Sequence, residues 1–141
     1  MNKIIGYTQG TFDLFHIGHL NLLEKAKIHC DYLIVGVNSD ELVKEYKNKD
    51  VIVTVDERAK ILRALRCVDE VIITNSLDKV KYHQLLNFDK IFIGDDWVND
   101  ERWVQTKEEM ANLGAELVFL PYTQTTSSTI LRKKISDIMP F

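Results

Sequence analysis

One stretch decides the fold: residues 3–37 read KIIGYTQGTFDLFHIGHLNLLEKAKIHCDYLIVGV. The stretch begins with a short apolar run over residues 3–8, and a helical pattern follows from His19 to about His29. A second apolar run covers residues 32–37. Two apolar runs joined by a helix form a β-α-β unit, in which the two strands are parallel. The stretch therefore predicts an α/β domain.

The rest of the chain continues this alternation. The spacing predicts further strands at residues 70–74, 90–94 and 116–120, helices at about 55–67, 77–86, 101–113 and from Ser128 onward, and a polar connection over residues 39–50. Thr54 and Glu57 have the spacing of a capping box, and Gly114 stands where a helix would end. Five buried runs separated by helices predict one Rossmann-like domain over residues 1–141, a doubly wound five-stranded parallel sheet with helices on both faces. Ligands bind such sheets beyond the carboxyl ends of the strands.

The composition restricts the class of protein. The 141 residues include 18 Lys and Arg against 21 Asp and Glu, a formal net charge of −3, and 45% are hydrophobic. This balance is typical of a folded globular domain and argues against a general nucleic-acid or membrane-surface binder. Cys30 and Cys67 are too few for a disulfide framework, so we expect reduced thiols. No apolar stretch has the length of a signal peptide core or a membrane span, and we expect a cytoplasmic protein.

The segment after the first predicted strand, residues 9–19, carries the strongest chemical signal. His16 and His19 lie three residues apart at a helix start, where free backbone N–H groups carry partial positive charge. Gly10 allows a tight turn, and Gly18 allows a ligand to approach the backbone closely. Imidazole N–H donors beside free helix amides suit a phosphate group whose negative charge grows during a reaction.

Other interpretations of this segment have less support. Asp13 and the two histidines could ligate a metal, but no further His or Cys cluster completes a zinc site. Capping alone would explain one histidine better than both. The dinucleotide fingerprint Gly-x-Gly-x-x-Gly and the Walker A sequence are absent, which removes the main support for hydride transfer and for P-loop ATPase chemistry.

Residues 10–19, GTFDLFHIGH, resemble the signature of the cytidylyltransferase family within the HxGH nucleotidyltransferase superfamily. The resemblance continues through residues 56–58, 67–71 and 94–97, and the chain length is that of small bacterial members that act on glycerol 3-phosphate. It implies transfer of CMP from CTP to this phosphorylated alcohol, with release of pyrophosphate, in the synthesis of a surface-polymer precursor. It also implies Mg²⁺ or another divalent cation bound with CTP, and a homodimer.

The resemblance assigns roles to individual residues. In this chemistry an acceptor phosphate oxygen attacks the α-phosphorus directly, so the protein supplies alignment and positive charge instead of a nucleophile. The implied catalytic residues are His16, His19 and Lys47. The implied nucleotide-binding residues are Thr11, Phe12, Gly18, Lys49, Gly94, Asp95, Ser127, Ser128, Thr129 and Arg132. Lysines in exposed loops are usually only solvated, and Lys44 is such a case beside Lys47 and Lys49.

The implied acceptor-binding residues are Asp13, Arg58, Arg66, Asp96 and Trp97. Arg58 stands just inside a helix start, where a cation opposes the helix dipole unless an anion lies nearby. Arg66 follows eight residues later, near the same face of the predicted helix. Asp13 is better suited to orienting its loop than to acting as a base, because the attacking phosphate is already ionised at neutral pH. Asp95 or Asp96 could help to hold Mg²⁺ through water, and the metal ligands stay unassigned.

The chain departs from the family pattern near its last predicted helix. Where relatives have Arg-Thr-Glu-Gly-Ile-Ser-Thr-Thr, Tyr122 replaces the arginine, and Gln124 and Thr125 replace Glu and Gly. The hydroxyls of residues 127–129 remain as donors at a helix start, and Arg132 is placed to replace the missing charge. Two alternatives stay open: a cytidylyl- or adenylyltransferase for another phosphorylated alcohol or sugar, and a non-catalytic nucleotide-binding regulatory domain, which would be expected to lose one of the histidines.

Overall fold

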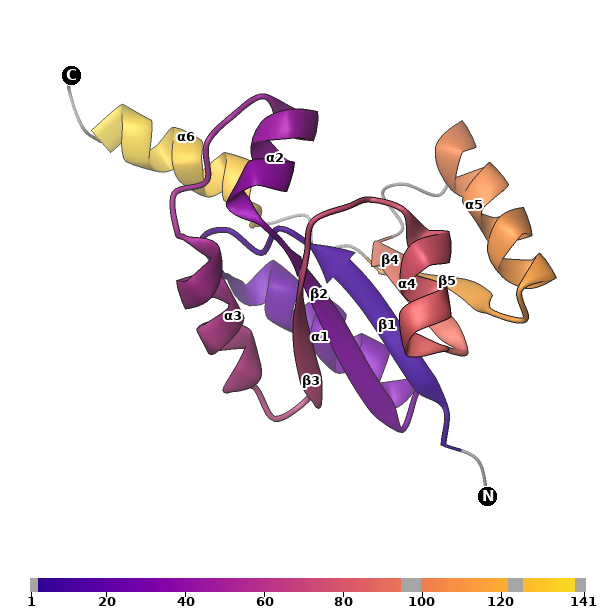
Figure 1. Ribbon diagram of the computed structural model, residues 1–141. Helices are drawn as coiled ribbons and strands as arrows, with labels where there is room; N and C mark the ends of the chain where they lie inside the picture. Colours follow the sequence, from indigo (N-terminus) through magenta and orange to yellow (C-terminus); the bar gives the residue numbers. More distant parts are fainter. Residues whose placement is uncertain (1–2, 95–99, 122–125, 139–141) are drawn as a thin grey trace.

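The computed structural model describes residues 3–94, 100–121 and 126–138 (Figure 1). In chain order the elements are β1 (Ile5–Gly10), α1 (Ile17–Ile28), β2 (Tyr32–Asn38), α2 (Asp40–Lys47), α3 (Val55–Arg63), β3 (Glu70–Thr74), α4 (Lys79–Leu86), β4 (Lys90–Gly94), α5 (Glu101–Asn112), β5 (Glu116–Leu120) and α6 (Ser128–Ile138). The strands form one five-stranded sheet in the order β3-β2-β1-β4-β5. All of its neighbouring strands are parallel, which confirms the predicted Rossmann-like sheet.

The strand order places β1 at the centre of the sheet. β1 pairs with β2 from Ile5 opposite Tyr32 to Gly10 opposite Val37, and on its other side with β4. The chain first builds outward from β1 through β2 to β3 and then crosses back to β4. This reversal leaves a switch point at the carboxyl ends of β1 and β4, where sheets of this type bind ligands.

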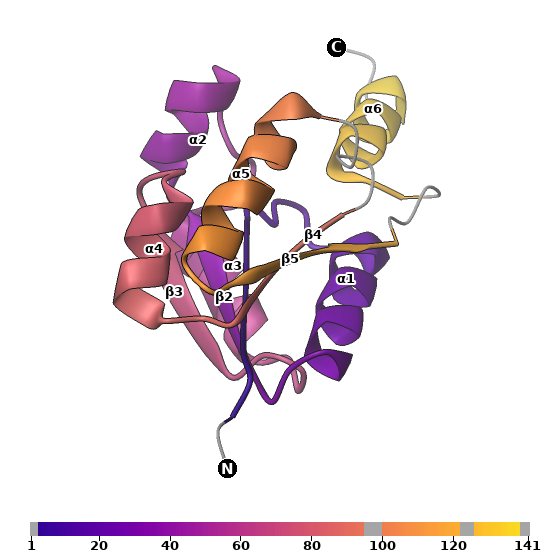
Figure 2. The same cartoon turned by 90° about the vertical axis from the view of Figure 1, so that its right-hand side faces the viewer.

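Two hydrophobic clusters hold helices against the two faces of the sheet. The first contains Leu23 and Ala26 of α1 with Leu62 of α3, all fully buried. The second contains Tyr82 of α4 and Met110 of α5. Figure 2 shows α1 on one side of the sheet and α4 with α5 on the other. The predicted cover of helices on both faces is therefore confirmed.

The polar connection predicted over residues 39–50 is wrong, because most of it forms α2. The Ser39 hydroxyl accepts a hydrogen bond from the Leu42 backbone N–H at 3.1 Å and so caps the first turn. Leu42 and Val43 are buried, which anchors the short helix to the domain. The helix ends at Asn48, whose φ of 52° lies in the left-handed region.

The helix predicted over residues 55–67 is shorter than expected. α3 ends at Arg63, and the chain then turns through residues 64–69 into β3. Thr54 precedes its first turn but makes no side-chain capping hydrogen bond, so the predicted capping box is absent. By contrast, Gly114 has a φ of +85° directly after α5, as expected of a glycine at a helix end.

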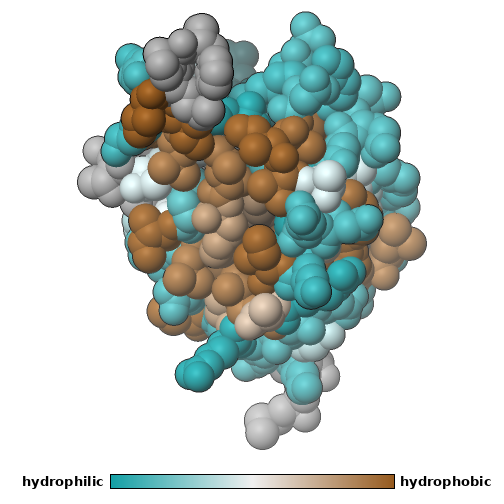
Figure 3. All heavy atoms as spheres, turned by 90° about the vertical axis from the view of Figure 1, so that its left-hand side faces the viewer, coloured by the Kyte–Doolittle hydropathy of each residue, from teal (hydrophilic) through white to brown (hydrophobic). Residues whose placement is uncertain are grey.

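The surface carries hydrophobic residues on the side of α3. Figure 3 shows them gathered on the face that lies to the left in Figure 1. On α3 itself the Ile61 side chain is 43% exposed. Within the described residues, no helix is both long enough and apolar enough to span a bilayer.

Candidate active site

A cavity of about 230 Å³ opens beyond the carboxyl end of β1, and several of the predicted site residues line it, although His16 does not. From the loop after β1, α1 and α2 it takes in Thr11, Phe12, Asp13, His19 and Lys47. From the segment after α2 and from α6 it takes in Lys49, Ser128, Thr129 and Arg132. The structure thus brings together residues that are far apart in the chain.

The side chains of His16 and His19 cap the first turn of α1. His16 Nδ1 accepts a hydrogen bond from the Gly18 backbone N–H at 3.0 Å. His19 Nδ1 accepts one from the His16 backbone N–H at 3.3 Å, which completes a capping box. The two rings stack with their centroids 3.8 Å apart. Because both Nδ1 atoms are acceptors, the proton of each neutral ring lies on Nε2, which becomes the donor left for a ligand.

Both histidines are uncharged at neutral pH. Burial, together with the neighbouring His16 ring, lowers the pKa of His19 to about 3. Burial also lowers the pKa of His16 below its ordinary value. The pair therefore offers two N–H donors to an anion, as the sequence predicts, and the positive charge of the pocket comes from other residues.

Gly18 is required by the packing of the first histidine. A Cβ atom at this position would lie 2.8 Å from His16 Cε1 and 3.2 Å from the backbone oxygen of Thr126. Any side chain would therefore push the His16 ring away from its cap or displace the start of α6. This steric role adds to the close ligand approach predicted for Gly18.

Asp13 joins three segments of the site. Its carboxylate accepts hydrogen bonds from the backbone N–H groups of Ile52 and Val53 at 2.8 and 2.9 Å, and it pairs with Arg132. Its backbone oxygen accepts from Ser128 Oγ. Burial alone would raise the pKa of Asp13, but these donors outweigh it and hold the pKa below its ordinary value. The structure supports the predicted orienting role, and the 3% exposed residue presents little surface to an acceptor.

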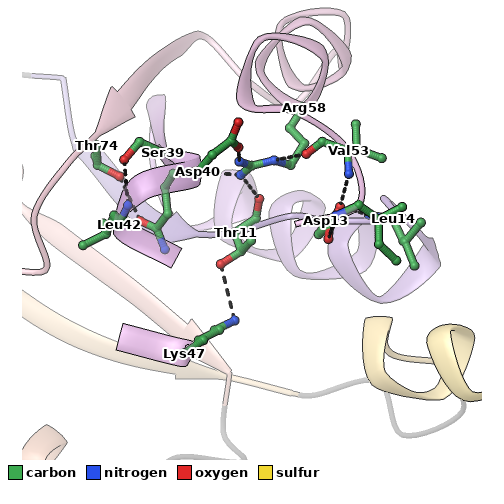
Figure 4. A network of polar contacts seen from close by, with 12 residues as sticks. Thr11, Asp13, Leu14, Ser39, Asp40, Leu42, Lys47, Val53, Arg58 and Thr74 are labelled. Atoms are coloured by element: carbon green, nitrogen blue, oxygen red, sulfur yellow. Dashed lines mark hydrogen bonds and ion pairs between the residues drawn. The ribbon is translucent and has the colours of Figure 1, made fainter. Parts of the chain in front are cut away.

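Arg58 is used within the protein. Its guanidinium donates to the backbone oxygens of Val53, Thr11 and Asn38 at 2.7–2.8 Å, and it pairs with the Asp40 carboxylate (Figure 4). The anion expected beside this helix start is therefore Asp40 of the chain itself. Arg58 is 1% exposed and does not line the cavity, so its contacts do not support the predicted acceptor-binding role.

Arg66 does not share a helix face with Arg58. α3 ends at Arg63, and Arg66 is an exposed residue of the turn that leads to the amino end of β3. The cavity lies at the carboxyl ends of the strands, at the opposite edge of the sheet. The geometric basis of the predicted acceptor-binding role of Arg66 is therefore wrong.

The three lysines predicted to lie in one polar loop are divided between α2, which contains Lys44 and Lys47, and the segment after it, which contains Lys49. Lys47 lies at the end of α2, and its Nζ donates to Thr11 Oγ1 at 3.4 Å. Lys49 follows the helix and lines the cavity. Lys44 faces solvent, where it pairs with Asp50 at 3.6 Å. Lys47 and Lys49 are thus the members of this group that reach the site.

The start of α6 combines capping with donor groups for a ligand. Ser127 Oγ accepts from the Ile130 backbone N–H at 3.1 Å and so caps the helix instead of lining the cavity. Arg132 Nε is buried and has no hydrogen-bond partner among the described residues.

The remaining predicted residues follow β4 or precede α6. Gly94 ends β4, opposite Leu120. Asp95, Asp96, Trp97 and Tyr122 lie outside the described residues.

Sequence reasoning missed two polar side chains beside the cavity. Gln9, the last residue but one of β1, lines it. Tyr46 of α2 lies next to it, with its hydroxyl 3.1 Å from Thr11 Oγ1. The position of Gln9 directly before Gly10 was an available signal. Tyr46 was missed because the helix that carries it was not predicted.

The described residues contain no cluster of imidazole, thiol and carboxylate side chains that could hold a metal. Nowhere in residues 3–94, 100–121 and 126–138 do three or more His, Cys, Asp or Glu side chains lie together as possible ligands. Asp13, which lines the cavity, is occupied by backbone donors and by Arg132. A divalent cation at this pocket would have to be held by groups other than these.

The sequence matches a family model and several known proteins. Residues 7–134 match the family model described as cytidylyltransferase-like. The chain is 36% identical to glycerol-3-phosphate cytidylyltransferase of Bacillus subtilis (strain 168), over 98% of this chain and 100% of that protein. It is also 36% identical to FAD synthase of Thermococcus sibiricus, over 97% of this chain and 93% of that protein.

Solved structures show the same fold. The lipopolysaccharide core biosynthesis protein from Thermoplasma volcanium GSS1 is similar with a TM-score of 0.73 and 25% identity, covering 89% of this chain and 100% of that chain. The pantoate-beta-alanine ligase from Francisella tularensis is similar in fold, with a TM-score of 0.64 and 14% identity, over 95% of this chain and 69% of that chain.

Proposed function

The chain belongs to the cytidylyltransferase-like family and is a nucleotidyltransferase, and from this premise we propose that it transfers CMP from CTP to glycerol 3-phosphate. The products would be CDP-glycerol and pyrophosphate, the former a precursor for a surface polymer. The observation that carries the proposal is the alignment, at 36% and 37% identity, with two glycerol-3-phosphate cytidylyltransferases over their full lengths. The histidine pair beside the cavity supplies the chemistry that such a reaction needs.

The histidines act on the α-phosphate in this proposal. A phosphate oxygen of the acceptor attacks the α-phosphorus, and the bond to the pyrophosphate oxygen breaks. Negative charge increases on the oxygens of the transferring group, and preorganised N–H donors stabilise it. His16 and His19 hold their Nε2 protons ready because their Nδ1 atoms are fixed by the backbone of α1. No proton has to leave either ring during the transfer.

Cations around the cavity receive the phosphate chain. Lys47 and Lys49 line one part of the cavity and Arg132 another. The unpartnered Nε of Arg132 supports a role for this residue in place of the arginine that Tyr122 replaces. Asp13 holds the Arg132 guanidinium at the cavity through their ion pair. We assign these three cations to the phosphates of CTP.

The family resemblance implies a divalent cation bound together with CTP. Mg²⁺ prefers oxygen ligands, keeps several waters and commonly binds through substrate phosphates. It would neutralise charge on the phosphate chain of CTP. The residues that line the cavity would then align the substrates and donate hydrogen bonds to them.

A second candidate is adenylyl transfer to another phosphorylated alcohol. FAD synthase of Thermococcus sibiricus is as similar to the chain as the Bacillus subtilis enzyme, at 36% identity. The bifunctional protein HldE of Hyphomonas neptunium is 34% identical, although the chain spans only 26% of its length. A non-catalytic domain is disfavoured, because His16 and His19 are both present and positioned as donors.

The test is a matrix of substrates. Pyrophosphate release is measured with Mg²⁺ while CTP, ATP, GTP and UTP are each combined with glycerol 3-phosphate and with other phosphorylated alcohols and sugars. We expect release with CTP and glycerol 3-phosphate. Release with a different pair would replace the proposed substrates and keep the histidine mechanism, and a chain that is silent with every pair would contradict the proposal.

A further inference from the structure

A line of hydrogen bonds runs from the core of the sheet to the cavity. The buried Tyr7 hydroxyl donates to Gln9 Oε1 at 2.6 Å. Gln9 Nε2 donates to Asn38 Oδ1 and to the Ser76 backbone oxygen, each at 2.9 Å. Burial, together with the neighbouring Tyr82, raises the pKa of Tyr7, so its hydroxyl stays protonated and acts as the donor.

The Asn38 side-chain amide continues this line of hydrogen bonds toward the cavity, with its oxygen as acceptor and its nitrogen as donor. Its Oδ1 accepts from Gln9 Nε2 and from Thr74 Oγ1, both at 2.9 Å. Its Nδ2 group therefore faces the Tyr46 hydroxyl, to which it donates at 3.1 Å. Asn38 is 3% exposed and Thr74 is fully buried, so this orientation is built into the core.

The line ends on the Thr11 hydroxyl. Either hydroxyl can be the donor in the contact between Tyr46 and Thr11 Oγ1, which lie 3.1 Å apart. Because the Tyr46 oxygen already accepts from Asn38, we take Tyr46 as the donor and Thr11 as the acceptor. Lys47 Nζ also donates to Thr11 Oγ1 (Figure 4). A hydroxyl has two acceptor lone pairs and one proton. With both lone pairs used, the Thr11 proton is left for a group in the cavity that Thr11 lines.

The backbone of Thr11 is held separately. Its carbonyl oxygen accepts from the Arg58 guanidinium at 2.7 Å. The remaining freedom at Thr11 is the direction of its side-chain hydroxyl, which is the feature that Tyr46 and Lys47 determine. A ligand that meets this hydroxyl must accept a hydrogen bond, and beside an ammonium group an ionised phosphoryl oxygen fits best.

We propose that Tyr46 is a positioning residue, which with Asn38 turns the Thr11 hydroxyl into a hydrogen-bond donor to a phosphoryl oxygen of the substrate. The inference rests on the proposed nucleotidyl transfer and adds a determinant to it. The phosphoryl oxygen belongs either to CTP or to the phosphorylated acceptor. The Lys47 ammonium binds the same oxygen or its neighbour.

The test begins with Tyr46→Phe, which removes the hydroxyl and keeps the ring. We expect kcat/KM to fall about fivefold to tenfold, the effect of one lost hydrogen bond, and the melting temperature to fall modestly, because Asn38 Nδ2 loses its acceptor. Tyr32→Phe is the matched control, because Tyr32 donates to Glu70 Oε1 at 2.8 Å at the far end of β2. This variant should keep the activity of the wild type.

A double-mutant cycle distinguishes positioning from a general structural effect. Thr11→Ser keeps the hydroxyl and should retain most activity, whereas Thr11→Val removes it and should lose at least as much as Tyr46→Phe. If Tyr46 acts through Thr11, adding Tyr46→Phe to Thr11→Val causes no further loss. Losses that multiply independently would overturn the inference, as would a Tyr46→Phe protein with wild-type kinetics.

Separate KM values identify the source of the oxygen. A higher KM for CTP in Tyr46→Phe assigns the oxygen to the nucleotide, and a higher KM for glycerol 3-phosphate assigns it to the acceptor. The wild type is measured first with the full substrate matrix. An inactive wild type overturns the proposed function and this inference with it, whereas an active wild type with independent losses overturns the inference alone.

Discussion

At the scale of the residue, His16 and His19 combine a structural contact with a chemical one. Their Nδ1 atoms cap α1, and in the proposed transfer their Nε2 protons are the donors to the α-phosphate. We expect His16→Ala and His19→Ala each to lower kcat by orders of magnitude and to destabilise the fold by about 1 kcal/mol through the lost cap. Pyrophosphate release and urea unfolding measure the two effects. His29→Ala, at the other end of α1, is the control, and a fully active His19→Ala protein would refute the mechanism.

The lowered pKa of His19 predicts how the free energy of unfolding depends on pH. Burial, with the help of His16, lowers the pKa of His19 to about 3 from 6.5, so between these values the unfolded chain binds a proton that the folded chain does not. The free energy of unfolding should therefore decrease as the pH falls below about 6.5. Urea unfolding at about pH 7.5 and about pH 5 measures the slope. His19→Asn should flatten it, and an unchanged slope in this variant would exclude His19 as the titrating group.

Sequence was a good guide to some of these residues and a poor guide to others. The spacing of His16 and His19 was sufficient to predict paired donors at a helix start. Arg58 was singled out for its position, but its buried contacts with Thr11, Asn38 and Asp40 depend on segments distant in the chain. Tyr46 reaches Thr11 only through the packing of α2. Contacts of this kind have no periodic signal in the sequence.

At the scale of the element, the segment between α2 and α3 is held from two sides. Asp13 accepts from the N–H groups of Ile52 and Val53, and Arg58 donates to the Val53 oxygen. We expect Arg58→Ala to destabilise the protein by about 3 kcal/mol or more, because it leaves buried acceptors without a donor. Urea unfolding measures the loss. Arg63→Ala, at the exposed end of the same helix, should stay within about 0.5 kcal/mol, and equal losses would contradict this assignment.

The strands were easier to predict than the helix ends. The runs at residues 70–74, 90–94 and 116–120 match β3, β4 and β5, because each strand is a short continuous apolar run between polar segments. α2 was missed because the helix is short and mostly charged, with only Leu42 and Val43 buried. Its signals were the Ser39 cap and the charges at its ends. α3 stopped early because residues 64–69 turn toward the edge strand.

At the scale of the whole molecule, the family resemblance leads us to expect a homodimer. The hydrophobic residues on the α3 side offer a surface on which two copies could meet (Figure 3). Sedimentation velocity over a range of micromolar concentrations should give the mass of two chains of 16.4 kDa. A species of one chain throughout this range would contradict the expectation.

The contacts of Asp13 with α6 also set an order of events during protein synthesis. Asp13 and Arg132, which pair, are separated by 119 positions, and the bond from Ser128 to the Asp13 oxygen spans 115. During synthesis, His16 and His19 leave the ribosome long before α6, which lines the pocket, has been translated. The nascent chain can therefore build its central strands early, while nucleotide capture must wait until α6 has emerged and docked.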